Sequence, residues 1–233
     1  MAFSTFLKNI RTDNKMTQAQ MAEALDISVN SVKLIENGST KFPGDKVLHR
    51  LSDEFNMSPL DVITEILFND EDYKDHPKRY LACRYQGYMY LQNWNVEKSP
   101  YVVQASNFPE YSFDGLLTKK RNLKNKVLVT SLIRHLPAYR VSKFADDLND
   151  GLAKMMFGVM WTPVPIKAVH MLFDSRYEAQ SSMYKVLSEL RMANVNIDII
   201  TILFEPDKGE VIKSQKISLK KVPEEFTEIH DLF

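Results

Sequence analysis

Cysteine, long apolar runs and net charge are all scarce in this chain of 233 residues. Its single cysteine, Cys83, cannot form a disulfide within the chain, which is typical of proteins from reducing compartments. No apolar stretch approaches the ~20 residues that a membrane helix needs, and residues 1–15 contain no apolar signal core. We therefore expect a cytoplasmic protein without a membrane segment.

The sequence signatures of common catalytic and metal sites are missing as well. There is no glycine-rich phosphate loop, no GxSxG motif and no nucleophile with an adjacent base. The five histidines are scattered without the spacing of zinc ligands, and Cys83 has no CxxC partner. We expect no catalytic residue, no metal site and no cofactor.

The charges balance overall, with 30 basic and 30 acidic residues, but they are distributed unevenly. Residues 1–68 hold seven Lys or Arg and nine Asp or Glu, whereas residues 78–233 hold 22 against 17. An anion-binding surface in the first segment must therefore come from segregation of charge. The basic residues expected on that surface are Lys8, Arg11, Lys15, Lys33, Lys41 and Lys46, with Asp53, Glu54, Asp61 and Glu65 away from it.

Residues 17–38, TQAQMAEALDISVNSVKLIENG, predict two short helices joined by a tight turn. Thr17 and Gln20 have the spacing of a capping box at the start of the first helix. Ser28 is the expected N-cap of the second helix, and Gly38 ends it. Val32 and Ile35 recur at helical spacing and should face inward.

The outer face of the second helix is polar at its N-terminal end. The DNA major groove admits one helix, whose first turn meets the base edges, so this face suits direct base readout. The residues that we expect to contact DNA are Gln18, Ser28, Val29, Asn30, Lys33 and Asn37, with Thr40 and Lys41 in the following loop.

These residues resemble the lambda-repressor/Cro-like, or XRE-type, helix-turn-helix family. The matching marks are Thr17-Gln18, Ala22, Ile27-Ser28, the run from Leu34 to Gly38, and Lys41-Phe42-Pro43. The resemblance covers roughly residues 3–67 and implies a five-helix domain that binds double-stranded DNA, usually as a homodimer on a two-fold operator.

Helical periodicity over residues 3–13, 45–55 and 59–67 supplies the remaining three helices, the last capped by Ser58 and begun by Pro59. The apolar face of the last helix closes the core of this domain and offers an alternative role as a dimer contact. Residues 1–68 then form the DNA-binding domain, and the acidic stretch 69–77 is the expected linker.

Residues 78–233 predict an α/β domain with a mixed sheet. Helices are expected at 78–94, 141–157 and 177–193, and strands at 101–106, 112–119, 126–133, 167–173, 196–205 and 211–219. This order resembles the restriction-endonuclease-like, PD-(D/E)xK, fold, with Asp114 at a metal-ligand position. Thr130 and Leu132 stand where that family has an acidic residue and a lysine, so the site looks incomplete.

The turn between the second and third strands is strongly basic. Its cations Lys119, Lys120, Arg121 and Lys124 fit either a solvated hairpin tip or a secondary DNA contact.

Taken together, these patterns predict a sequence-specific transcriptional regulator, a repressor that acts as a dimer on an inverted repeat. The α/β domain would then dimerise, sense an effector or hold a protein partner. A nuclease of the PD-(D/E)xK type directed to its site by the helix-turn-helix, and an antitoxin, remain the alternatives.

Overall fold

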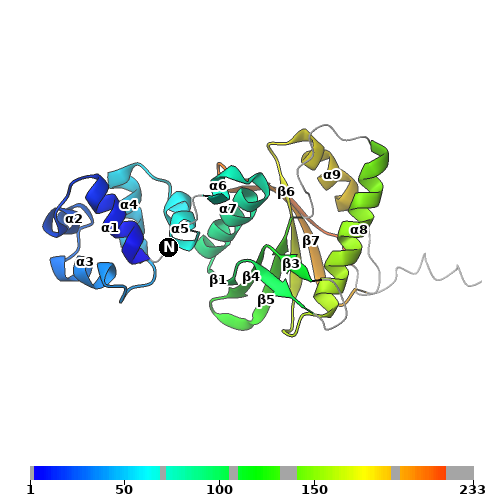
Figure 1. Cartoon of the computed structure of the whole chain (residues 1–233), viewed down its shortest axis with the longest axis horizontal. Helices are drawn as coiled ribbons and strands as arrows, with labels where there is room; N and C mark the ends of the chain where they lie inside the picture. The colour runs from blue at the N-terminus through cyan, green and yellow to red at the C-terminus, as the bar shows by residue number, and fades with distance from the viewer. Residues whose placement is uncertain (1–2, 69–71, 105–109, 132–140, 190–194, 219–233) are drawn as a thin grey trace, which may run out of the picture. The chain divides into compact units, whose positions relative to one another are not determined.

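A computed structural model describes residues 3–68, 72–104, 110–131, 141–189 and 195–218. The chain divides into two compact units, Met1–Asp75 (unit 1) and His76–Phe233 (unit 2), each with its own core (Figure 1). The described residues include no helix that is long and apolar enough to cross a membrane. Two-domain architecture is therefore confirmed.

Unit 1 begins with the five helices that the sequence predicts. They are α1 (Phe3–Asp13), α2 (Gln18–Ala24), α3 (Val29–Glu36), α4 (Asp45–Phe55) and α5 (Pro59–Leu67). Their apolar stripes meet in a core whose fully buried members include Phe3, Leu7, Met21, Leu25, Val32, Leu51 and Ile63. Burial of these stripes stabilises helices that are too short to persist alone in water.

The segment expected to be a linker is largely helical. Residues 72–75 form α6 (Asp72–Asp75), and Pro77 is already the first residue of the next helix. Tyr73 is buried, and its hydroxyl donates to Glu65 Oε1 at 3.1 Å, while Lys74 Nζ lies 2.5 Å from the same carboxylate. Residues 72–75 of the expected linker are therefore helical, and the two units divide within this segment, after Asp75.

Unit 2 is built on a six-stranded mixed sheet in the order β1-β4-β5-β6-β7-β8. The strands are β1 (Trp94–Lys98), β4 (Gly115–Lys119), β5 (Asn122–Thr130), β6 (Ala168–Asp174), β7 (Asp198–Glu205) and β8 (Glu210–Lys216). The central strands β5, β6 and β7 are parallel, and the other pairs are antiparallel. A separate ribbon pairs β2 (Tyr101–Val103) with β3 (Tyr111–Phe113).

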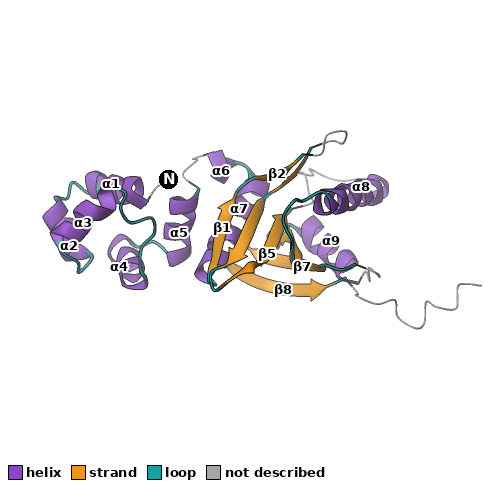
Figure 2. Ribbon diagram, turned by 90° about the horizontal axis from the view of Figure 1, so that it is seen from below, coloured by secondary structure: helices purple, strands orange, loops and turns teal. Residues whose placement is uncertain are grey.

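Helices cover both faces of this sheet (Figure 2). On one face α7 (Pro77–Leu91) packs through Leu81, Tyr85 and Met89. On the other face lie α8 (Val141–Met160) and α9 (Glu178–Glu189), with Met155 and Leu187 in the core. Each lies in the chain between two parallel strands, α8 between β5 and β6 and α9 between β6 and β7, where a crossover connection is required. Alternate residues of β6 and β7 point to opposite cores, so these two central strands read as nearly continuous apolar runs.

Three details of unit 2 differ from the sequence prediction. The first helix stops at Gln92 because Asn93 adopts a φ of 66°, and Trp94 opens the unpredicted strand β1. The predicted second strand divides at Asp114 between β3 and β4, which belong to different sheets. On α9 the helical spacing of Met183 and Leu187 would also place Val186 inward, but Val186 is exposed and Tyr184 is buried.

Candidate nucleic-acid interface

The start of α2 is held by a reciprocal capping box. The Gln20 backbone N–H donates to Thr17 Oγ1 at 3.2 Å, and the Thr17 backbone N–H donates to Gln20 Oε1 at 2.8 Å. Two donors that the helix itself cannot satisfy are thereby paired. The predicted start of this helix is confirmed.

A tight turn then separates α2 from α3. Asp26 takes a left-handed φ of 51°, and the Ile27 backbone N–H donates to Ala22 O at 3.0 Å. Lys46, expected to bind phosphate, instead lies 2.7 Å from Asp26 Oδ2 and donates to Asp26 O at 3.1 Å. That lysine lowers the pKa of Asp26 and supports the turn.

The recognition helix α3 has defined ends. Ser28 Oγ accepts a hydrogen bond from the Ser31 backbone N–H at 3.0 Å, which confirms the predicted N-cap. At the other end the helix closes on Asn37, and Gly38 follows with a φ of 82°, a conformation that glycine adopts without strain. The length and direction of α3 are thus set by local hydrogen bonds.

One side of α3 is buried and the other is open. Val32 and Ile35 face the core, whereas Val29, Asn30, Lys33 and Asn37 are exposed, as the pattern predicts. Leu34 also lies on the open side with 47% of its surface exposed. It was not predicted as a contact, although its position four residues after Asn30 places both on the same helical face.

Glu36 connects α3 to the first two helices. Its carboxylate accepts from Arg11 Nε at 2.6 Å and from Gln18 Nε2 at 2.8 Å. Burial alone would raise the pKa of Glu36, but these hydrogen bonds hold it below its usual value. The same contact raises the pKa of Arg11, whose guanidinium also donates to Met16 O.

This arrangement changes the roles of two predicted contacts. Arg11 is engaged inside unit 1, so its expected place on the phosphate-binding surface is wrong. Gln18 is half-buried and its Nε2 donates to Glu36, so this side chain links α2 to α3.

Two of the predicted cations, one on α3 and one in the loop that follows it, are exposed to solvent. Lys41 and Lys33 are exposed and have no ion-pair partner among the described residues, and Thr40 is half-buried beside Lys41. A positively charged border therefore follows the open face of α3.

Comparison with known families now identifies unit 1. Residues 7–62 match a helix-turn-helix family model. The N-terminal unit is therefore a DNA-binding helix-turn-helix domain of the XRE type. No curated protein and no solved structure matches the chain, so the restriction-endonuclease-like resemblance of unit 2 stays a prediction.

Unit 2 places Asp114 in a network of hydrogen bonds. Its Oδ2 accepts from the Ser131 hydroxyl at 2.7 Å and from the Ser131 backbone N–H, and Lys78 Nζ lies 3.6 Å from Oδ1. Burial raises the pKa of Asp114, although Lys78 and Ser131 oppose that shift. Thr130 bonds to Tyr111, while Leu132 lies outside the described residues.

No group of three or more His, Cys, Asp or Glu side chains in the described part of the chain could hold a metal ion. Asp114 therefore acts there as a hydrogen-bond acceptor that joins β5 to the start of β4. Asp114→Asn would remove the negative charge that faces Lys78 and should therefore weaken this network.

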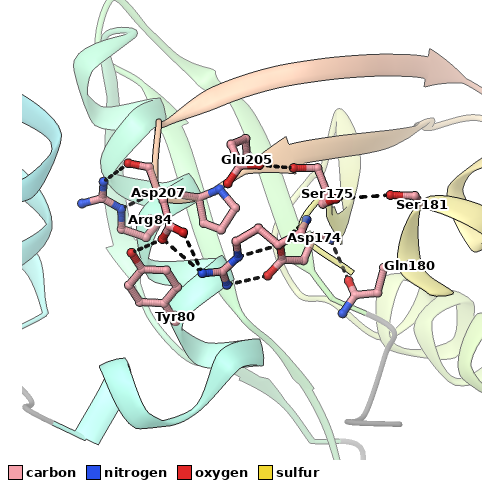
Figure 3. A network of polar contacts seen from close by, with 10 residues as sticks. Tyr80, Arg84, Asp174, Ser175, Gln180, Ser181, Glu205 and Asp207 are labelled. Atoms are coloured by element: carbon pink, nitrogen blue, oxygen red, sulfur yellow. Dashed lines mark hydrogen bonds and ion pairs between the residues drawn. The ribbon is translucent and has the colours of Figure 1, made fainter. Parts of the chain in front are cut away.

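The carboxyl ends of β6 and β7 carry a second polar cluster, drawn in Figure 3. Asp174 is buried at the end of β6 and receives two hydrogen bonds from Arg176, at 3.0 and 2.7 Å. Arg176 Nη1 also contacts both carboxylate oxygens of Asp207 at 3.1 Å, and Tyr80 donates to Asp207 at 2.8 Å.

Ligand sites in α/β folds often occupy this edge, but here the charges satisfy one another. Burial followed by the bond to Asp207 raises the pKa of Tyr80 to about 12, and the bonds from Tyr80 and Arg176 lower the pKa of Asp207 despite its burial. Arg84 adds a bond from Nε to Pro206 O at 2.8 Å. Sequence reasoning did not find this cluster, which ties α7 to the turns after β6 and β7.

The predicted basic turn forms the β4–β5 hairpin. Lys119 and Lys120 are half-buried, whereas Arg121 and Lys124 are exposed.

Proposed function

We propose that this protein is a sequence-specific transcriptional regulator, a repressor that binds DNA as a homodimer on an inverted repeat. The observation that carries the proposal is the open face of α3, where Val29, Asn30 and Lys33 are exposed on a helix capped by Ser28. Such a helix enters the major groove with its first turns against the base edges.

The chemistry of these side chains suggests the readout. An asparagine amide pairs with adenine N6 and N7, and a lysine with guanine O6 and N7. Val29 and Leu34 offer apolar contact to thymine methyl groups. Lys33 and Lys41 add phosphate attraction, which remains modest because residues 1–68 carry more acidic than basic side chains.

Dimerisation follows from the small number of base pairs that one α3 helix reads. The apolar side chains of α5 are buried in unit 1, so this helix does not supply the contact that the sequence suggested as an alternative. In unit 2, Phe157 and Met160 in the last turn of α8 and Trp161 directly after it are exposed. In a two-fold dimer an apolar patch meets its own copy and is complementary to itself, which supports a dimer contact through unit 2.

We also propose that the protein has no nuclease activity. Hydrolysis with Mg²⁺ requires several hard oxygen ligands, and Asp114 is already bonded to Ser131 and close to Lys78. Incubation of plasmid DNA carrying the operator with the protein and Mg²⁺ or Mn²⁺ should leave it intact; cleavage that Asp114→Asn abolishes would favour the nuclease alternative.

The experiment that tests the regulator is selection of bound DNA from a random pool, followed by titration of the selected site. Asn30→Ala should weaken binding to the best site by ~1–3 kcal/mol and binding to random DNA far less, because it removes a base contact. Asn9→Ala, at an exposed position of α1, is the matched control.

The same titration gives the stoichiometry. Two chains should bind each selected operator, with half-site centres about one turn, ~10 base pairs, apart. Equal losses on selected and random DNA would contradict the readout, and one chain on a single half-site would contradict the dimer.

A further inference from the structure

The β4–β5 hairpin of unit 2 concentrates positive charge at one end of the sheet. Residues 115–130 include five Lys or Arg and no acidic residue. Among these cations Lys126 is neutralised, since its Nζ lies 2.8 Å from both carboxylate oxygens of Glu97 on β1. The remaining four are Lys119, Lys120, Arg121 and Lys124.

Two of the four are held against aromatic rings. Lys120 Nζ lies 3.6 Å from the centre of the Tyr90 ring, and Lys119 Nζ lies 5.1 Å from the Trp94 ring. Lys119 also donates to Gln92 O at 3.3 Å. These contacts hold both lysines at the base of the hairpin tip.

The other two cations lie at the tip itself. Lys119 pairs with Asn122 and Thr118 pairs with Lys126, so residues 123–125 bulge out of the register with β4. This irregularity leaves Lys124 exposed beside Arg121, and neither has an ion-pair partner among the described residues. Leu123 lies between them with 67% of its surface exposed.

We infer that this hairpin tip is a second, sequence-independent contact for the phosphate backbone of double-stranded DNA. The inference rests on the proposed function, because the helix-turn-helix brings a duplex to the same chain. The exposed cations Arg121 and Lys124, on a hairpin whose residues 115–130 include no acidic side chain, are complementary to phosphates, which carry no sequence information. Arg121 and Lys124 make the contact, and the two held lysines strengthen the local potential.

The test measures the affinity of the full chain for duplex DNA at several salt concentrations. Each phosphate contact contributes about 0.9 to the slope of log affinity against log salt, so Arg121→Gln with Lys124→Gln should make the slope shallower by about 1.8 for each bound chain. The loss of affinity should be equal for the selected operator and for random duplex DNA. The charge-conserving pair Arg121→Lys with Lys124→Arg should keep the original slope.

A matched control removes the same charge elsewhere in unit 2. Lys208→Gln with Lys213→Gln changes two exposed lysines in the β7–β8 region and should leave the slope unaltered. The inference would be overturned if the slope of the hairpin variant is unchanged or if the control variant shows an equal effect. It would also be overturned if the hairpin variant loses affinity for single-stranded nucleic acid alone.

The outcome separates this inference from the proposed function. If selection yields no preferred site and Asn30→Ala has no effect, the regulator proposal fails, while the slope on random duplex still decides the role of the hairpin. If the operator is found and the slope does not change, only the hairpin contact is lost.

Discussion

His170 is hydrogen-bonded to Tyr85 inside unit 2, and the burial of its imidazole makes the stability of this unit depend on pH. The Tyr85 hydroxyl lies 2.8 Å from His170 Nδ1, and their rings meet edge to face with centroids 6.0 Å apart. Burial lowers the pKa of His170 to about 4 from its ordinary 6.5. The imidazole is therefore neutral at pH 7, and the tyrosine donates to it.

The free energy of unfolding should fall as the pH drops from about 7 to 4. Within this window the unfolded chain binds a proton at His170 and the folded chain does not. The contribution of neutral His170 to stability is therefore complete above pH 6.5 and lost toward pH 4. The effect is on the order of 3 kcal/mol. Denaturant unfolding at a series of pH values measures it.

His170→Gln is the matched control for this pH dependence. Its side-chain oxygen still accepts a hydrogen bond from Tyr85, but the residue does not titrate. Protonation of other groups destabilises both proteins at low pH. The prediction therefore concerns the difference between the two curves of unfolding free energy against pH, which should shrink as the pH falls. Parallel curves would show that His170 does not contribute.

Among the secondary-structure elements, α7 and β4 approach closely at Gly115. A Cβ atom on this glycine would lie 2.4 Å from Gln86 Oε1. Gln86 is fully buried, and its Nε2 donates to Ser99 Oγ at 3.2 Å and to Asp114 O at 3.1 Å. The amide cannot turn away without breaking these bonds, so the distance between helix and strand depends on the absence of a side chain.

Gly115→Ala should therefore destabilise unit 2 by ~1–3 kcal/mol, the usual result of overpacking a core. Chemical denaturation measures the change. Gln86→Ala alone removes two hydrogen bonds and should also destabilise, but it makes room for the new methyl group. The double variant Gly115→Ala with Gln86→Ala should then lose less free energy of unfolding than the two single variants lose together. If the two losses simply add, the steric contact is not supported.

For the whole molecule, the main expectation is that unit 1 folds without unit 2. Its core is complete within residues 1–75, and Tyr73 on α6 is bonded to Glu65 on α5. The end of the folding unit therefore lies after α6, beyond the boundary at residue 68 that the sequence suggested.

A fragment of residues 1–75 should show cooperative thermal unfolding by circular dichroism. A fragment of residues 1–68 lacks the buried Tyr73 and should be less stable by ~1–3 kcal/mol, because the apolar surface under that ring becomes exposed. A third fragment, 1–75 with Tyr73→Ala, should match the shorter one. Equal stability of the first two would mean that α6 does not belong to the folding unit.

Local chemistry explains what could be predicted from the sequence. The capping box of Thr17 and Gln20, the Ser28 cap and the turn at Gly38 all join residues within four positions of each other, so their spacing is visible in the chain. The exposed face of α3 follows from helical periodicity in the same way. For this reason the DNA-binding unit was predicted almost completely.

Tertiary structure decided the features that depend on distant residues. Glu36 meets Arg11 across 25 positions, and Arg84 meets Pro206 across 122, so no local pattern indicates either contact. Residues 112–119 read as one strand because the alternation of side chains continues through Asp114, whose bond to Ser131 lies where the chain changes sheets. Alternating and helical spacing determine which side chains can be buried, but the partner that buries them is fixed by chain topology.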